Sequence, residues 1–295
     1  MTVRCSRSDR FRSRTVPSIP HPTILLRPGI GYSKGPLCAP RPAQEATPGV
    51  LSYYNQGMEQ TLSGKIAIVT GGTRGIGRAI AERLLREGAA VAVCSRLRQN
   101  VQALVKACEP GAGGRLLAEA ADVSQPAEVQ RFFASVDARF GGVDFLINTA
   151  GIGIFKSVAD LTVEEWRRSI DLNLSGVYYC SHEALPRMQK RGGGYIVNIS
   201  SLAGKNAFAG GAAYNASKFG LNGFSEAMML DHRYQDVRVS YIMPGSVDTD
   251  FSPRTGAAAW KIQPEDIAEV VAMLLHMPAR TLISRVEVRP SKPQK

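Results

Sequence analysis

Cysteine and histidine are scarce in this chain, and neither occurs in a metal-binding pattern. The five cysteines are scattered without any C-x-x-C pair, and the four histidines are isolated. Zinc sites need ligands at short, regular spacings, and a disulfide framework needs an even set of cysteines. We therefore expect no metal site, no disulfide framework and a reducing compartment, the cytoplasm.

Long apolar runs are missing as well. No stretch approaches the ~20 apolar residues that cross a bilayer, so we expect no membrane partner. The composition, 44% hydrophobic and 21% charged, is that of an ordinary globular protein. No internal repeat or linker divides residues 58–295, which we expect to form one domain.

The net charge of +11 is concentrated near the N-terminus. Residues 1–57 hold eight Lys and Arg against Asp9 and Glu45, a net of +6, which leaves +5 for residues 58–295. A basic surplus confined to a tail says little about the partner of the folded part, so we expect no nucleic-acid partner.

The same residues 1–57 contain eight of the seventeen prolines and no periodic apolar pattern. Such a segment buries too little surface to offset its ordering entropy, so we expect a disordered extension. It is either an organellar transit peptide or the product of a start assigned upstream of Met58. We favour the second interpretation, because the prolines interrupt the amphipathic helix that a transit peptide needs.

From residue 66 onward, short β-rich runs alternate with helical stretches. Helical spacing is clear over Ile76–Glu87 and over Ile267–Leu275, which Pro264 precedes. Continuous apolar strands separated by helices predict an α/β fold, a doubly wound parallel sheet of the Rossmann type. The expected strands are Ile66–Thr70, Val91–Cys94, Leu116–Ala121, Phe145–Asn148, Ile196–Ser200, Val239–Met243 and Val286–Arg289.

A glycine-rich turn follows the first of these strands, with the sequence Thr70-Gly71-Gly72-Thr73-Arg74-Gly75-Ile76-Gly77. Gly71 permits a tight turn, Gly75 lets the backbone approach a pyrophosphate, and Gly77 lets the helix pack close to the strand. The helix N-terminus attracts the phosphate charge. This strand–turn–helix context predicts nucleotide binding.

A second cluster comprises Ser201, Tyr214 and Lys218. Tyr214 and Lys218 are four residues apart on an expected helix, so they share one face. A phenol with a pKa near ~10 needs a nearby cation to work as an acid or base at neutral pH, and Lys218 supplies one. Ser201 follows the fifth strand and can donate a hydrogen bond to a substrate oxygen.

Together these residues resemble the short-chain dehydrogenase/reductase family, and are similar to its 3-oxoacyl-[acyl-carrier-protein] reductase-like members. The resemblance covers residues 60–250 in order. Besides the residues already named, the family's motifs match Asp122-Val123, Asn148-Thr149-Ala150-Gly151, Asn173, Pro244-Gly245 and Thr249. Thr149 departs from the asparagine usual there. The segment from Thr249 to Pro264, the family's substrate-covering loop, is short and leaves the substrate class open.

The resemblance implies an enzyme that transfers a hydride between a nicotinamide cofactor and a carbonyl compound or secondary alcohol, with a 3-oxoacyl thioester as one candidate. Tyr214 would be the general acid or base, and Lys218 would lower its pKa and hold the nicotinamide ribose. Ser201 would polarise the substrate oxygen, and Asn173 would position a water. The cofactor-binding residues expected in all are Gly71, Thr73, Arg74, Gly75, Ile76, Gly77, Ser95, Arg96, Asp122, Val123, Asn148, Ala150, Gly151, Tyr214, Lys218, Pro244, Gly245, Val247 and Thr249.

The end of the second strand indicates which cofactor is used. NAD-specific folds place an Asp or Glu there for the ribose 2′-hydroxyl. This chain has Cys94-Ser95-Arg96 instead. Arg74 and Arg96 can both meet a 2′-phosphate, so we expect NADP(H).

Two other functions compete with an enzyme. A binding protein that senses NADP(H) without turnover is one, but sensors in this family tend to lose the tyrosine or the lysine, and this chain has both Tyr214 and Lys218. Nucleic-acid binding through the basic tail rests on composition alone. Relatives pair the helix bearing Asn173 and the helix bearing Tyr214 across subunits, so a homotetramer or dimer is expected.

Deletion of residues 1–57 should leave activity and melting temperature essentially unchanged, because a disordered extension buries little surface. Thermal unfolding and turnover of the full-length and shortened chains test this. A markedly lower melting temperature or an inactive truncation would show that the extension packs on the domain. Import of a tagged full-length chain into an organelle would support the transit-peptide interpretation.

Overall fold

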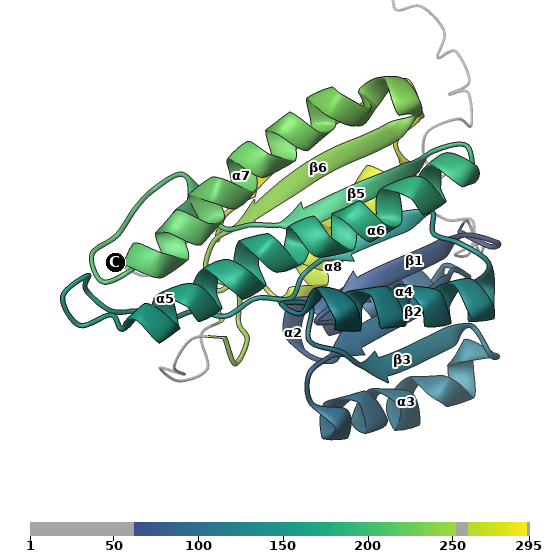
Figure 1. Cartoon of the computed structure of the whole chain (residues 1–295), viewed down its shortest axis with the longest axis horizontal. Coiled ribbons are helices and arrows are strands. Elements are labelled where there is room, and N and C mark those ends of the chain that lie inside the picture. Colours follow the sequence, from purple (N-terminus) through teal and green to yellow (C-terminus); the bar gives the residue numbers. More distant parts are fainter. Residues whose placement is uncertain (1–61, 252–258, 294–295) are drawn as a thin grey trace, which may run out of the picture. The chain divides into compact units, whose positions relative to one another are not determined.

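A seven-stranded parallel sheet forms the centre of the computed structural model, which describes residues 62–251 and 259–293. The strands lie in the order β3-β2-β1-β4-β5-β6-β7, so the chain winds outward from β1 in one direction and then from β4 in the other. The predicted doubly wound sheet is confirmed (Figure 1). Its strands are β1 Ile66–Thr70, β2 Ala90–Ser95, β3 Leu116–Ala120, β4 Phe145–Asn148, β5 Gly194–Ile199, β6 Val237–Pro244 and β7 Arg285–Val288.

The predicted strands correspond one to one to the observed strands, but several ends differ. The strand predicted over Ile196–Ser200 begins at Gly194, where Gly194 pairs with Val237 of β6. Pairing with a neighbouring strand, rather than apolar content, sets where a strand begins. The predicted extension, residues 1–57, lies outside the described residues, and the boundary at residue 58 stays a prediction.

Helices cover both faces of the sheet, as Figure 1 shows. Alternate residues of one strand face opposite cores: Ala67 and Val69 of β1 pack with α2, α3 and α8, whereas Ile66 and Ile68 pack with α4, α6 and α7. This two-sided burial explains why the strands read as continuous apolar runs. The helices are α2 Gly75–Arg86, α3 Arg98–Ala112, α4 Pro126–Phe140, α5 Val163–Ile170, α6 Gly176–Lys190, α7 Ala212–His232 and α8 Pro264–His276.

A turn of π-helix, η1 (Asp171–Ser175), joins α5 to α6 without a break. The preceding α5 begins with a capping box, in which Thr162 and Glu165 satisfy each other's backbone N–H groups. Such π turns interrupt a helix at a cost and are often found at functional sites. Asn173 lies in this turn and is fully buried.

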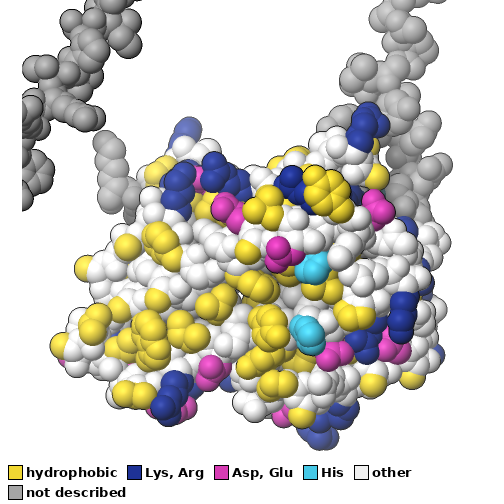
Figure 2. Space-filling view, turned by 45° about the horizontal axis from the view of Figure 1, so that its top comes forward, with side chains coloured by type: hydrophobic (Ala, Val, Ile, Leu, Met, Phe, Trp, Pro, Cys, Tyr) yellow, Lys and Arg dark blue, Asp and Glu magenta, His cyan; other side chains and the backbone are white. Residues whose placement is uncertain are grey.

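The outer faces of α6 and α7 carry large apolar side chains that remain exposed. They include Tyr178 on α6 and Phe219 and Leu230 on α7. Figure 2 shows hydrophobic side chains gathered in patches on the face turned toward the viewer. No helix within residues 62–251 and 259–293 is both long and apolar enough to span a membrane.

A buried chain of amide and hydroxyl groups ties the middle of the sheet to α7. Asn148 of β4 donates to Asn198 of β5 at 2.9 Å, and Asn198 donates to the Ser225 hydroxyl at 2.9 Å. Ser225 in turn donates to the Leu221 carbonyl at 2.6 Å. These hydrogen bonds hold α7, the helix that carries Tyr214 and Lys218, against β4 and β5.

Replacing Asn198 with alanine should lower the free energy of unfolding by about 1–3 kcal/mol, because the buried Asn148 side-chain amide loses its hydrogen-bond acceptor, whereas Ser225 keeps its bond to the Leu221 carbonyl. Urea unfolding measures this loss. Gln189→Ala is the matched control, because it removes an exposed amide–amide hydrogen bond to Gln235. It should change stability by no more than about 0.5 kcal/mol. Equal losses of unfolding free energy in the two variants would show that the buried hydrogen bonds of Asn198 do not stabilise the fold.

Candidate active site

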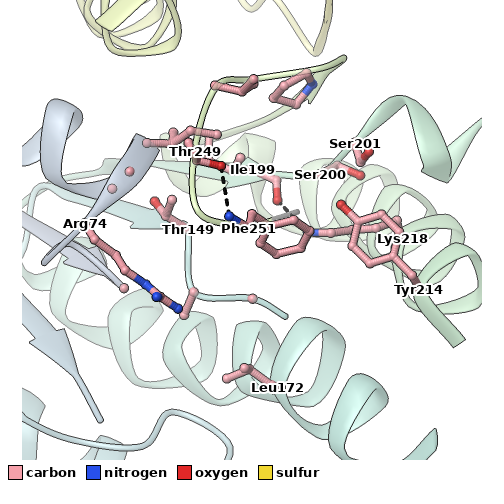
Figure 3. Close-up of a pocket in the computed structure, with 18 of the residues that line it drawn as sticks. Arg74, Thr149, Leu172, Ile199, Ser200, Ser201, Tyr214, Lys218, Thr249 and Phe251 are labelled. Atoms are coloured by element: carbon pink, nitrogen blue, oxygen red, sulfur yellow. Dashed lines mark hydrogen bonds between the residues drawn. The ribbon is translucent and has the colours of Figure 1, made fainter. Parts of the chain in front are cut away.

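The carboxyl ends of β1, β2, β4, β5 and β6 surround a cavity of about 650 Å³. This is where a doubly wound sheet reverses its winding direction, and where such folds bind their ligands. Figure 3 shows Arg74 on one side of the cavity and Tyr214 and Lys218 on the other. The cavity therefore joins the two groups of residues that the sequence singles out.

The glycine-rich turn between β1 and α2 has no room for side chains. Gly71 has a φ of 66°, and a Cβ there would lie 2.8 Å from the Ala150 Cα. A Cβ on Gly77 would lie 2.6 Å from the Gly71 carbonyl oxygen. Arg74, the N-cap of α2, makes no side-chain capping hydrogen bond. The turn thus presents backbone and a helix N-terminus to the cavity, as an anionic group requires.

Thr70, the last residue of β1, holds the turn after β4 in place. Its hydroxyl oxygen accepts hydrogen bonds from the backbone N–H groups of Thr149 at 3.1 Å and Ala150 at 3.2 Å. Because Thr70 contacts only the backbone of residue 149, a threonine there in place of the family's usual asparagine leaves this turn intact. Ala150 is brought against Gly71, so the two turns form one wall of the cavity.

The end of β2 lines the cavity with Cys94, Ser95 and Arg96. The carboxylate beside this wall belongs to Asp122, whose Oδ2 lies 4.0 Å from the Arg96 guanidinium. Asp122 Oδ1 already accepts from the backbone and hydroxyl of Ser124. Arg96 is half exposed, so its guanidinium can still meet a phosphate.

Tyr214 and Ser201 both line the opposite wall, where the Ser201 side chain interacts with the Tyr214 phenol. Ser201 follows β5 in an extended conformation and also accepts from the Ala203 backbone N–H at 3.1 Å. Lys218, one turn further along α7, donates to the Ile199 carbonyl at 2.9 Å. The Lys218 Nζ lies 5.9 Å from the centre of the Tyr214 ring. The predicted Ser–Tyr–Lys cluster thus exists as one group.

Burial dominates the titration of this cluster. It raises the pKa of Tyr214, which the hydrogen bond from Ser201 lowers only in part. It also lowers the pKa of Lys218 to about 8. The expectation that Lys218 depresses the pKa of Tyr214 is therefore not met in this structure. The physical reason is that burial disfavours both charged forms, and that the Lys218 ammonium is directed to the Ile199 carbonyl rather than to the phenol.

Asn173 lies behind the cavity wall rather than on it. Its side-chain nitrogen donates to the Ile152 carbonyl at 2.9 Å and to the Ser217 hydroxyl at 3.0 Å, and its oxygen accepts from the Ile152 N–H at 2.8 Å. A Cβ on Gly151 would stand 3.2 Å from that oxygen and 4.0 Å from the Lys218 Nζ. Asn173 thus fixes the loop after β4 against α7, close to Lys218.

Three of the predicted site residues, Asn148, Asp122 and Asn173, do not line the cavity. Asn148 bonds to Asn198, and Asp122 closes its own turn through Ser124. The predicted residues that do line it are Gly71, Thr73, Arg74, Gly75, Ile76, Gly77, Ser95, Arg96, Val123, Ala150, Gly151, Ser201, Tyr214, Lys218, Pro244, Gly245, Val247 and Thr249.

Several lining residues were not predicted from the sequence. The most prominent are the three phenylalanines Phe155, Phe208 and Phe251. Each lies in a gap between motifs, where no spacing rule marks it, although Phe208 stands between Ser201 and Tyr214. The described residues contain no group of three His, Cys, Asp or Glu that could hold a metal.

A glycine turn at the switch point and a Ser–Tyr–Lys group on the opposite wall define a dehydrogenase of the Rossmann class. The profile of the short chain dehydrogenase family matches residues 65–259. The chain belongs to this family.

Similar proteins span most of the described chain. A 3β-hydroxysteroid dehydrogenase of Mediterraneibacter gnavus is 39% identical over 194 residues, 65% of this chain and 70% of its own. A metagenomic short-chain oxidoreductase solved with NADP is 39% identical, with a TM-score of 0.70, covering 79% of this chain and all of that one. An alcohol dehydrogenase of Thermococcus sibiricus, solved with 5-hydroxy-NADP, is 29% identical with a TM-score of 0.73, covering 78% and 99%.

Combining Ser95→Asp with Arg96→Leu should shift the cofactor preference from NADPH toward NADH. The new carboxylate repels a 2′-phosphate and accepts hydrogen bonds from a free 2′-hydroxyl. Loss of the arginine–phosphate contact should cost about 1.5–3 kcal/mol, or roughly 10- to 150-fold in NADPH affinity. Because Arg74 remains on the cavity wall, the switch should be partial.

The measurement is the ratio of kcat/KM for the two cofactors. Arg98→Leu is the control, because it removes one positive charge two residues further on, at a position that does not line the cavity. A wild type that already prefers NADH would mean that Arg74 and Arg96 do not meet a 2′-phosphate.

Proposed function

We propose that this protein is an NADP(H)-dependent oxidoreductase that interconverts a carbonyl compound and the corresponding secondary alcohol. The observation that carries the proposal is that Ser201, Tyr214 and Lys218 share one cavity with the glycine turn and Arg74. Membership of the short chain dehydrogenase family supports it.

The cavity fits an NADP(H) molecule at several points. The glycine turn lines the cavity with backbone and with the N-terminus of α2, which suits a pyrophosphate. Arg74 and Arg96 suit a 2′-phosphate, and Lys218 is placed to hold the nicotinamide ribose. The metagenomic oxidoreductase was solved with NADP and the Thermococcus sibiricus alcohol dehydrogenase with 5-hydroxy-NADP. When bound, the cofactor supplies or accepts the hydride.

The chain's own residues handle the proton. Because burial raises the pKa of Tyr214, its phenol stays protonated at neutral pH and can donate a proton to a carbonyl oxygen. Ser201 can donate a hydrogen bond to the same oxygen, and Asn173 positions the loop beside Lys218. Oxidation of an alcohol needs the phenolate instead, so the rate of oxidation should rise with pH.

The finer substrate is not fixed by these residues. Two of the three similar proteins, the hydroxysteroid dehydrogenase and the alcohol dehydrogenase, have names that point to substrates with a CH–OH group. A 3-oxoacyl thioester is one candidate carbonyl substrate for this chain. The presence of both Tyr214 and Lys218 beside an accessible cavity favours turnover over a non-catalytic NADP(H) sensor.

We also propose a homo-oligomer, a tetramer or a dimer, assembled through α6 and α7. Its support is the set of exposed apolar side chains on these helices, including Tyr178, Phe219 and Leu230. A cytoplasmic location is proposed because the cysteines within the described residues, Cys94, Cys108 and Cys180, are free thiols.

Tyr214→Phe should reduce turnover by at least about 10²-fold, the lower end of general acid–base contributions. The ring still packs, but the transferable proton is gone, so NADPH binding should be nearly unchanged. Following NADPH absorbance and fluorescence with a panel of ketones measures both quantities.

Tyr234→Phe is the matched control, since Tyr234 is almost fully exposed and does not line the cavity. In the wild type, kcat/KM for alcohol oxidation should rise with pH as Tyr214 ionises, because the phenolate is the base. Activity of Tyr214→Phe within a few-fold of wild type would exclude this role.

A further inference from the structure

We propose that the substrate is an uncharged ketone, or the matching secondary alcohol, carried on an apolar ring system. This inference rests on the proposed function and adds the substrate class. It comes from three phenylalanine rings, Phe155, Phe208 and Phe251, which line the cavity yet remain nearly half exposed. Exposed apolar surface gathered inside a concave site marks a binding surface for an apolar partner.

The rings form a connected group around the proton donor. The Phe155 ring centre lies 5.4 Å from that of Tyr214 in an edge-to-face arrangement, and 5.9 Å from that of Phe208. The Phe251 ring centre lies 5.7 Å from that of Tyr214 and 6.5 Å from that of Phe155. A carbonyl oxygen bound to Tyr214 and Ser201 would therefore have its carbon skeleton among aromatic rings.

Two glycines make room for these rings. A Cβ on Gly153 would lie 2.6 Å from the Phe155 Cζ and 2.9 Å from the Phe251 Cε1. A Cβ on Gly211 would lie 2.7 Å from the Phe208 Cε2. The rings thus rest directly on backbone, which keeps them at the cavity wall.

The segments that carry Phe155 and Phe208 are also fixed to each other. The residue after Phe155, Lys156, forms a β-bridge with Gly211. Asn215 of α7 holds the Phe208 segment, donating to the Ala203 carbonyl at 2.7 Å and accepting from the Phe208 N–H at 3.4 Å. A preformed apolar wall loses little conformational entropy when a rigid ligand binds.

The charges near this wall do not suit an anionic substrate. Lys156 is paired with Glu165 at 2.6 Å, and Lys205 with Glu287 at 2.6 Å. Lys261, which lines the cavity, lies 3.8 Å from Asp248. A substrate carboxylate at this wall would lose water without gaining an unpaired cation from any of these three lysines.

A flat ring system fits this arrangement better than a small or charged carbonyl compound. Aromatic side chains bind apolar rings through offset-stacked and edge-to-face contacts. In the reduction, Tyr214 would give its proton to the carbonyl oxygen while the carbonyl carbon takes the hydride that bound NADPH would supply. The Tyr214 phenolate would then regain a proton from solvent, so one ketone, one NADPH and one proton become one secondary alcohol and one NADP⁺.

The test compares four carbonyl probes with the full chain and NADPH: 2-tetralone, methyl acetoacetate, acetoacetate and acetoacetyl-coenzyme A. We expect kcat/KM for 2-tetralone to exceed that for methyl acetoacetate by about tenfold or more, the size of hydrophobic pocket discrimination. Acetoacetate carries a negative charge that methyl acetoacetate lacks, so its kcat/KM should be lower than that of methyl acetoacetate.

Phe208→Ala should lower kcat/KM for 2-tetralone by about tenfold and change that for methyl acetoacetate by no more than about twofold, because only the larger ketone reaches the ring. Phe208→Leu should retain most of the activity with 2-tetralone. Tyr234→Ala, which removes an exposed ring outside the cavity, is the control and should change neither value.

Calorimetric titration of 2-tetralone into the NADP⁺-loaded chain separates this inference from the proposed function. If no probe oxidises NADPH but 2-tetralone binds and Phe208→Ala weakens its binding, the proposed reduction fails and the apolar site stands. If methyl acetoacetate turns over while 2-tetralone is not preferred, the inference alone is wrong. A higher kcat/KM for acetoacetate or acetoacetyl-coenzyme A, an equal loss for all probes in Phe208→Ala, or no binding of 2-tetralone would each overturn it.

Discussion

The close approach of backbone to backbone at the switch point is the constraint on which the rest of the site depends. Gly71 lies against Ala150, and Gly77 lies against the Gly71 carbonyl, so three segments meet with no side chain between them. Thr70 secures the contact by accepting two N–H groups from the turn after β4. This contact positions both the glycine turn, which lines the cavity, and the loop after β4, which Asn173 holds.

On the opposite wall the controlling effect is desolvation. Burial disfavours a charge on both Tyr214 and Lys218. It therefore raises the pKa of the Tyr214 phenol and lowers the pKa of the Lys218 ammonium. The same burial accompanies the packing of the Phe155 and Phe251 rings against Tyr214. A neutral proton donor in apolar surroundings suits a neutral carbonyl group, and this links the acid–base chemistry to the choice of substrate.

Most of the fold was predictable because its signals are local. The apolar run Ile66–Thr70 and the glycine turn after it specify strand, turn and helix within a dozen or so residues. The Tyr214–Lys218 spacing placed both side chains on one helical face. The three phenylalanines could not be found this way, since their grouping depends on Gly153, Gly211 and a bridge between distant loops. The direction of the Tyr214 pKa shift was missed for a similar reason, because burial is a property of the folded chain.

The π turn at Asp171–Ser175 has a consequence for how this protein can change over evolution. A π turn holds one residue more than regular helix, and that extra residue sets the rotation of everything that follows. Deleting a single residue there would restore an ordinary helix and rotate one flank relative to the other by about 100°. Asn173 would then leave both Ile152 and Ser217. The length of this segment is therefore constrained by the three hydrogen bonds of Asn173 as strictly as the identity of that residue.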